Sequence, residues 1–256
     1  MHQLKSRISK IAPIFKRYGA CLILPAILLS QPAARAEVPM KQAKIIIEHN
    51  ATDNDTGFQI FLDADGWQKL QIIGPDGLVA EFLPAGPMTE LGMTELFLET
   101  VEPANAKVPM AKTLEKMREG QYQFIATASK MGGVEGQIKG KATLSHKIPG
   151  GVTLVAPLEG ATVPLGQTKM VWQASAKAIN GSNINIIAYQ LIIEKDEEPH
   201  QRMIGKRGLS MYLPAATTSI EVDKVFFEAA TSYKWEVLAI EESGNQTLQT
   251  GTFKTQ

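Results

Sequence analysis

The sequence predicts an all-β protein of two β-sandwich domains in tandem, and three observations support this prediction. Short runs of alternating apolar residues recur along most of the chain, and Gly, Pro, Asn and Asp separate them. Near the C-terminus, Tyr233 opens a run whose alternate residues to position 239 suit one buried face. In the middle, Lys147-Ile-Pro-Gly-Gly151 has the composition of a short linker. The domains are therefore expected at residues 37–148 and 149–256.

Residues 1–36 have the features of a secretory signal peptide. They contain six basic residues and no acidic residue, and their apolar run, 20–29, precedes small residues at 34 and 36 where cleavage is expected. The alternative is an uncleaved anchor, but the run is about half as long as a spanning helix requires, and Pro25 interrupts it. The sequence thus predicts an exported protein, periplasmic or extracellular, with no membrane span after cleavage.

The charge balance argues against some classes of partner. The whole chain has 26 basic and 26 acidic residues, but without residues 1–36 it has 20 basic and 26 acidic residues, a net charge of −6. Binding of nucleic acid or anionic lipid needs a basic face, so neither is expected as a partner. The only cysteine, Cys21, lies within the predicted signal, so neither disulfides nor thiolate metal sites are expected.

The first predicted domain, residues 37–148, combines strands with one helix. A short helix that covers one end of the sandwich is expected near 109–119, because Met110, Leu114 and Met117 share one helical face. Alternating runs predict seven strands, at 43–48, 57–62, 67–73, 78–83, 94–100, 121–129 and 136–145.

The second predicted domain, residues 149–256, contains about seven strand-like runs in about 105 residues, which is typical of an immunoglobulin-like sandwich. The run Tyr122-x-Phe124 in the first domain has the same alternation as Tyr233-x-Trp235 in the second. Both domains are therefore expected to be immunoglobulin-like sandwiches. The alternative is convergent patterning, because any edge hairpin over a core looks similar.

From residue 153 to 254 the chain resembles a fibronectin type III domain. The resemblance depends on the segment Pro157–Gly160, on Trp172 and Tyr189, and on the block from Phe227 through Tyr233 and Val237 to Gly244. In that family the matched Trp and Tyr residues build the core, so the resemblance implies structural roles, and a binding or spacing function by analogy only. More loosely, the acidic segment Asn50–Gln59 makes the chain similar to secreted bacterial proteins of unassigned function. Those proteins join an N-terminal β domain with such a segment to a C-terminal fibronectin type III domain.

Four acidic residues are the best candidates for a metal site. Asp53 and Asp55 precede the strand expected at 57–62, and Asp63 and Asp65 follow it. Alternate Asp and Asn residues before a Gly can present several oxygens to Ca²⁺. The two turns are about 17 Å apart at roughly 3.3 Å per residue, so one shared ion is not expected. The alternative is that these residues form Asx turns.

Other features that indicate function are few. No catalytic residues are predicted, because the sequence lacks a Gly-x-Ser-x-Gly elbow, a His-Glu-x-x-His helix and a phosphate-binding loop. Trp67 begins a predicted strand and is a candidate ligand contact by stacking, with core packing as the alternative.

The first functional hypothesis is a non-catalytic exported binding, adhesion or spacer protein that contacts an envelope or extracellular protein or glycan. A calcium-dependent binding module is the second hypothesis, and a hydrolase of cell-wall or polysaccharide substrates is the third. No cofactor other than Ca²⁺ is expected.

Overall fold

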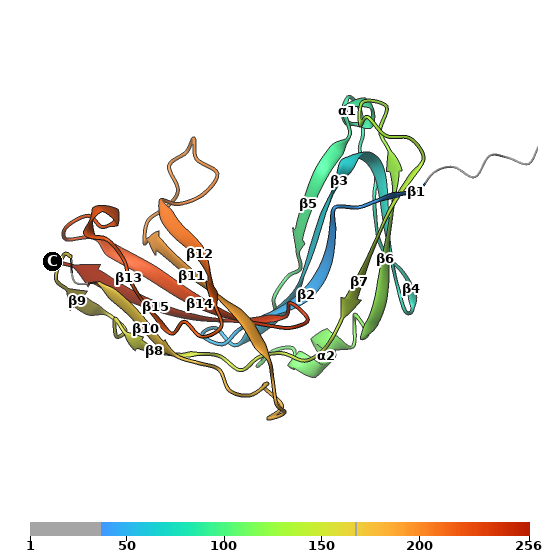
Figure 1. Ribbon diagram of the computed structural model, residues 1–256. Helices are drawn as coiled ribbons and strands as arrows, with labels where there is room; N and C mark the ends of the chain where they lie inside the picture. Colours follow the sequence, from blue (N-terminus) through green and yellow to red (C-terminus); the bar gives the residue numbers. More distant parts are fainter. Residues whose placement is uncertain (1–36, 167) are drawn as a thin grey trace, which may run out of the picture. The chain divides into compact units, whose positions relative to one another are not determined.

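The computed structural model describes residues 37–166 and 168–256, which form a nearly all-β structure (Figure 1). This confirms the predicted fold class. The predicted signal peptide lies outside the described residues. Among the described helices, none has both the length and the apolar character needed to cross a membrane.

The N-terminal half is a sandwich whose two layers share one long strand. Strand β3 (Asp55–Gly74) joins two runs that were predicted as separate strands. Its first part pairs with β2 (Gln42–Asn50) and β5 (Met93–Glu99), and its second part pairs with β4 (Gly77–Phe82) and β6 (Gly120–Ala128). Register shifts near Trp67 mark the change of layer. Strand β7 (Gln137–Leu144) lies between β6 and the short β1 (Glu37–Pro39).

Two short helices lie in this half. Helix α2 (Met110–Leu114) lies where a helix was expected and is shorter than 109–119. Met117 follows its end and is nevertheless buried in the first hydrophobic cluster, so the predicted apolar face does pack inward. Helix α1 (Met88–Leu91) is a single turn before β5.

The C-terminal half is a sandwich of two separate layers. One layer contains β8 (Thr153–Ala156), β10 (Lys169–Gln173) and β13 (Ser219–Glu221). This division of strands is that of an immunoglobulin-like sandwich of the fibronectin type III kind. The other layer consists of β9 (Ala161–Val163), β15 (Gln246–Thr255), β14 (Ser232–Glu241), β11 (Ile186–Lys195) and β12 (Gly208–Pro214), and a 3₁₀ turn, η1 (Lys224–Phe226), precedes β14.

Tyr233, which opens the run that the sequence predicted to have one buried face, forms a tyrosine corner. Its ring is buried, and its hydroxyl oxygen accepts a hydrogen bond from the Glu228 backbone N–H at 2.8 Å. Tyr122 makes a similar contact in the N-terminal half, where its hydroxyl donates to the Arg118 carbonyl at 2.7 Å. The sequence indicated that the runs beginning at Tyr122 and Tyr233 are alike. The structure extends this similarity to the hydrogen bond that each tyrosine hydroxyl forms with nearby backbone.

The two halves have separate hydrophobic clusters but share one sheet. The first cluster comprises residues 45–148, and the second comprises residues 152–253. Strands β2 and β15 pair in parallel between them, with Glu48 opposite Gln246. Asn245 is buried at this junction. Its side-chain oxygen accepts from the Ile47 N–H at 2.8 Å, and its amide donates to two carbonyls of the segment 145–147.

Candidate functional site

The first predicted acidic turn is an Asx turn. The Asn50 side-chain oxygen accepts hydrogen bonds from the backbone N–H groups of Thr52 and Asp53. The Asn50 amide donates to the Asp53 carboxylate at 3.0 Å. Asn54 has a φ of 54°, which is left-handed backbone that Asn tolerates. These contacts account for Asn50 and Asp53 without a metal. Asp55 begins β3, and one of its carboxylate oxygens is buried without a hydrogen-bond partner.

The second predicted acidic pair, Asp63 and Asp65, faces a lysine. Lys41 Nζ lies 3.7 Å from an Asp63 carboxylate oxygen and 3.1 Å from an Asp65 one. Because Asp55 and Asp63 lie at opposite ends of the β2–β3 pairing, the structure does not bring the two turns together.

The interpretation of Trp67 as a ligand contact is wrong. Its side chain is fully buried in the first hydrophobic cluster. The register shift in β3 carries this position into the sandwich interior, where the ring packs with core residues and cannot stack on a ligand from solution.

Three glutamates that the sequence did not single out do come together. Glu48 on β2, Glu99 at the end of β5 and Glu102 just beyond it each place a carboxylate oxygen within 4.8 Å of the others. Among the described residues, none of these three carboxylates forms an ion pair with a Lys or Arg side chain. This cluster, the glutamate trio, depends on the register of β2, β3 and β5, which no spacing along the chain reveals.

Amide groups and one glycine shape the glutamate trio. The Gln59 side-chain amide donates to Glu48 and to Glu99, in both cases at 2.9 Å, and the Gln246 amide also donates to Glu48. A Cβ at Gly57 would lie 2.7 Å from Cγ of Glu102. Glycine at this position therefore permits the close approach of the Glu102 side chain.

Two members of the glutamate trio, Glu102 and Glu48, have raised pKa values. Burial, together with the charges of Glu48, Glu99 and Asp55, raises the pKa of Glu102 to about 7. Burial is also the main cause that raises the pKa of Glu48, and Glu99 adds to it. One oxygen of Glu102 is buried without a hydrogen-bond partner. The arrangement therefore favours a bound proton or a nearby cation near neutral pH.

An aromatic pair lies beside these carboxylates. Phe61 of β3 is directly opposite Phe97 of β5, and Phe97 is 60% exposed. Lys44 Nζ lies 5.8 Å from the centre of the Phe61 ring. We call this surface of β2, β3 and β5 the outer face, and it consists of Lys44, Ile46, Glu48, Gln59, Phe61, Asp63, Glu95, Phe97 and Glu99.

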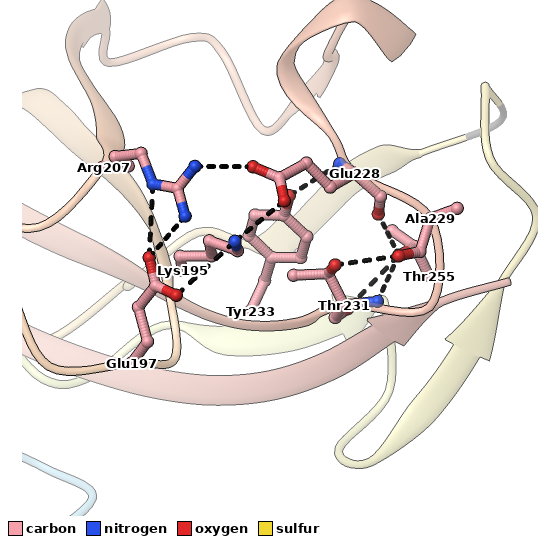
Figure 2. Close-up of polar contacts among 8 residues, drawn as sticks. All are labelled: Lys195, Glu197, Arg207, Glu228, Ala229, Thr231, Tyr233 and Thr255. Atoms are coloured by element: carbon pink, nitrogen blue, oxygen red, sulfur yellow. Dashed lines mark hydrogen bonds and ion pairs between the residues drawn. The ribbon is translucent and has the colours of Figure 1, made fainter.

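A second charged group, in the C-terminal half, is fully paired. Figure 2 shows Lys195 and Arg207 alternating with Glu197 and Glu228 in a closed ring. Its four ion pairs measure 2.8 to 3.5 Å. The ring adjoins the Tyr233 corner, because Glu228 supplies the N–H that bonds the tyrosine hydroxyl (Figure 2). Its charges satisfy one another, so we assign it a structural role.

Among known proteins, only solved structures show a likeness to this chain. No family model matches the chain, and no curated protein sequence matches it. A two-domain fibronectin type III segment of chicken tenascin is similar in structure, with 10% identity and a TM-score of 0.31, over 84% of this chain and 99% of that chain.

Two longer structures are also similar. The FN1–FN3 domains of chicken CNTN1 match at 11% identity and a TM-score of 0.29, over 87% of this chain and 66% of that one. A bacterial ice-binding adhesin matches at 14% identity and a TM-score of 0.28, over 86% of this chain and 65% of the adhesin chain. The fibronectin type III-like fold of the C-terminal half follows from the strand order given above.

Proposed function

We propose that this protein is a non-catalytic, exported binding or spacer protein that contacts an envelope or extracellular protein or glycan through its outer face. The observation that carries the proposal is the exposed Phe97 ring, which lies on a regular sheet between Glu95 and Glu99. An exposed aromatic side chain provides a large contact area at low entropic cost. The sheet beneath it fixes the position of the ring, as a binding surface requires.

Capture of partners by the purified protein tests this proposal. The protein is crosslinked to envelope fractions and applied to glycan arrays, beside the variants Phe97→Ser and Leu158→Ser. Leu158 is a matched control, because it is 67% exposed in the C-terminal half. We expect Phe97→Ser to lose contacts that Leu158→Ser retains. Equal capture by both variants, or hydrolysis of a cell-wall polysaccharide that Glu102→Gln abolishes, contradicts the proposal.

Calcium dependence is a second candidate function, and the glutamate trio favours it over the acidic turns. Clustered carboxylates are the oxygen ligands that Ca²⁺ prefers. If the protein binds Ca²⁺ there, excess Ca²⁺ raises its melting temperature relative to chelator, because binding to the native state stabilises it. Glu102→Gln should remove that increase, and Asp53→Asn should keep it. An unchanged melting temperature in the parent protein excludes this function.

A further inference from the structure

We propose that the edge of β5 binds an extended, cationic segment of another protein as an additional antiparallel strand. This inference rests on the proposed function and names the class of partner that the outer face receives. Strand β5 pairs with β3 on one side, and no other described strand pairs with its second side (Figure 1). An unpaired strand edge is a template for backbone pairing with an extended chain.

The backbone groups of β5 that face the unpaired edge can be assigned. The Thr100 N–H donates to the Phe58 carbonyl at 3.0 Å, so this pair is hydrogen-bonded. Hydrogen-bonded pairs alternate along an antiparallel ladder, so Leu96 and Leu98 direct their backbone groups toward β3. The N–H and C=O groups of residues 95, 97 and 99 therefore point toward the unpaired edge.

The side chains of residues 95, 97 and 99 determine which side chains an added strand needs. Glu95, Phe97 and Glu99 are exposed on the outer face, while Leu96 and Leu98 are partly buried against the first hydrophobic cluster. A matching segment carries Lys or Arg opposite each glutamate, an apolar or aromatic residue opposite Phe97, and apolar residues between them.

The charges around β5 favour a cationic partner. Glu95 and Glu99 form no ion pair among the described residues, and Glu99 belongs to the glutamate trio. Asp63, opposite Glu95, already faces Lys41, and Lys44 is the one basic residue within the outer face. Like charges at the short separations of the glutamate trio repel one another, so a cation that binds beside Glu99 relieves part of that repulsion.

The same charges disfavour a second copy of β5 as the partner in the register that stacks the two Phe97 rings. Two β5 strands that met antiparallel with Phe97 opposite Phe97 would place Glu95 opposite Glu99 twice. Facing carboxylates repel each other and so oppose this pairing. Charged side chains on edge strands protect natural proteins from edge-to-edge aggregation in the same manner. The edge therefore favours a strand of opposite charge over a second copy in this register.

The experiment uses the full protein and capped heptapeptides. The probe is threonine–lysine–valine–phenylalanine–valine–lysine–threonine, and one control carries glutamates in place of the lysines. A second control has N-methyl groups on the backbone amides that would face β5. Affinity is measured by fluorescence anisotropy at low ionic strength. We expect the lysine peptide to bind about tenfold more tightly than either control.

Protein variants and amide exchange locate the binding. Glu95→Gln/Glu99→Gln should weaken binding of the lysine peptide about threefold to tenfold. The matched control Glu198→Gln/Glu221→Gln, two exposed acids of the C-terminal half, should leave it unchanged. Bound peptide should slow hydrogen exchange at the amides of residues 95, 97 and 99. Equal affinity for the lysine and glutamate peptides, or no slowing at these amides, overturns the inference.

Failure of this inference and failure of the proposed function give different results. If Phe97→Ser loses its captured partner but excess lysine peptide does not compete with that partner, the outer face binds another chemistry and only the inference fails. If no captured contact depends on Phe97, the proposed function itself fails.

Discussion

At the scale of single residues, two tyrosines anchor two sandwiches by similar means. Each buries its ring and makes one hydrogen bond to backbone just upstream, at Glu228 for Tyr233 and at Arg118 for Tyr122. Alternation along the sequence was enough to predict both runs, because a strand with one buried face must place its large apolar residues two apart.

Removing either tyrosine hydroxyl should destabilise the protein. We expect Tyr233→Phe and Tyr122→Phe each to lower the free energy of unfolding by about 1–2 kcal/mol, because a partly buried backbone group loses its partner. Tyr212→Phe is the control, since that side chain is 70% exposed. Urea denaturation measures the three values. A loss in the control as large as in the other two would contradict the assignment of the tyrosine corners.

Glu102 should make stability depend on pH. Its pKa is about 7 in the folded protein and ordinarily 4.5, so the folded state binds more protons between these values. The free energy of unfolding therefore falls as pH rises from about 4.5 to about 7. Glu102→Gln should reduce this slope and stabilise the protein at pH 8 by about 1 kcal/mol, an amount discounted for its partial exposure.

Thermal or urea unfolding at several pH values measures this effect. Glu198→Gln is the control, because Glu198 is exposed and lies outside the trio. The assignment is wrong if Glu102→Gln keeps the parent slope between pH 4.5 and pH 7. Glu48 acts in the same direction as Glu102, so a residual slope is expected in the variant.

At the scale of elements, β3 accounts for most of the differences between prediction and structure. The sequence predicted two strands, at 57–62 and 67–73, and the structure joins them. Both runs alternate correctly, but alternation does not tell whether a chain turns or continues through a change of layer. Trp67 lies at that change, and its burial agrees with core packing, the alternative to the ligand-contact interpretation.

The glutamate trio also belongs to this scale. Its members come from β2, from the end of β5 and from the segment that follows, and they meet because of strand register. A single sequence shows which residues are acidic but not the strand register. The sequence therefore predicted a metal site at the acidic turns and not at the glutamate trio. The Asx turn at residues 50–53 accounts for Asp53, and the ion pairs with Lys41 account for Asp63 and Asp65.

Gly57 should control the position of Glu102. An added Cβ would lie 2.7 Å from Cγ of Glu102, so Gly57→Ala must displace that side chain. We expect a loss of about 1–3 kcal/mol in the free energy of unfolding. The loss should shrink when Glu102→Ala is combined with it in a double-mutant cycle. Gly205→Ala is the control, because nothing lies within 4 Å of its Cβ position. Additive effects of the two changes would contradict the proposed contact.

At the scale of the whole molecule, the described residues combine two hydrophobic clusters with one continuous sheet. Asn245 lies where β2 meets β15. Its side chain forms hydrogen bonds with the backbone of β2 and with the backbone of the segment 145–147, both in the N-terminal half. The linker composition at 147–151 predicted a boundary between domains, but it did not reveal that strands would pair across it. The paired segments are almost 200 residues apart in the chain, so no local sequence pattern indicates that they meet.

Removing the Asn245 side chain should loosen this junction. Asn245→Ala leaves the buried Ile47 N–H without its acceptor, and we expect about 2–4 kcal/mol of destabilisation. The parent protein should unfold in one calorimetric transition, and the variant in two, because its two clusters then unfold separately. Asn185→Ala is the control, as that amide bonds only the exposed Glu242 carboxylate. A single transition with unchanged midpoint in Asn245→Ala would show that the junction contributes nothing.

Hydrogen exchange of the protein with its captured envelope or extracellular partner tests the binding role of the outer face most directly. The account predicts that the partner slows exchange at the β5 amides of residues 95, 97 and 99, and that Phe97→Ser abolishes this protection while Leu158→Ser keeps it. Protection confined to the C-terminal half, with the β5 amides unchanged, would contradict it.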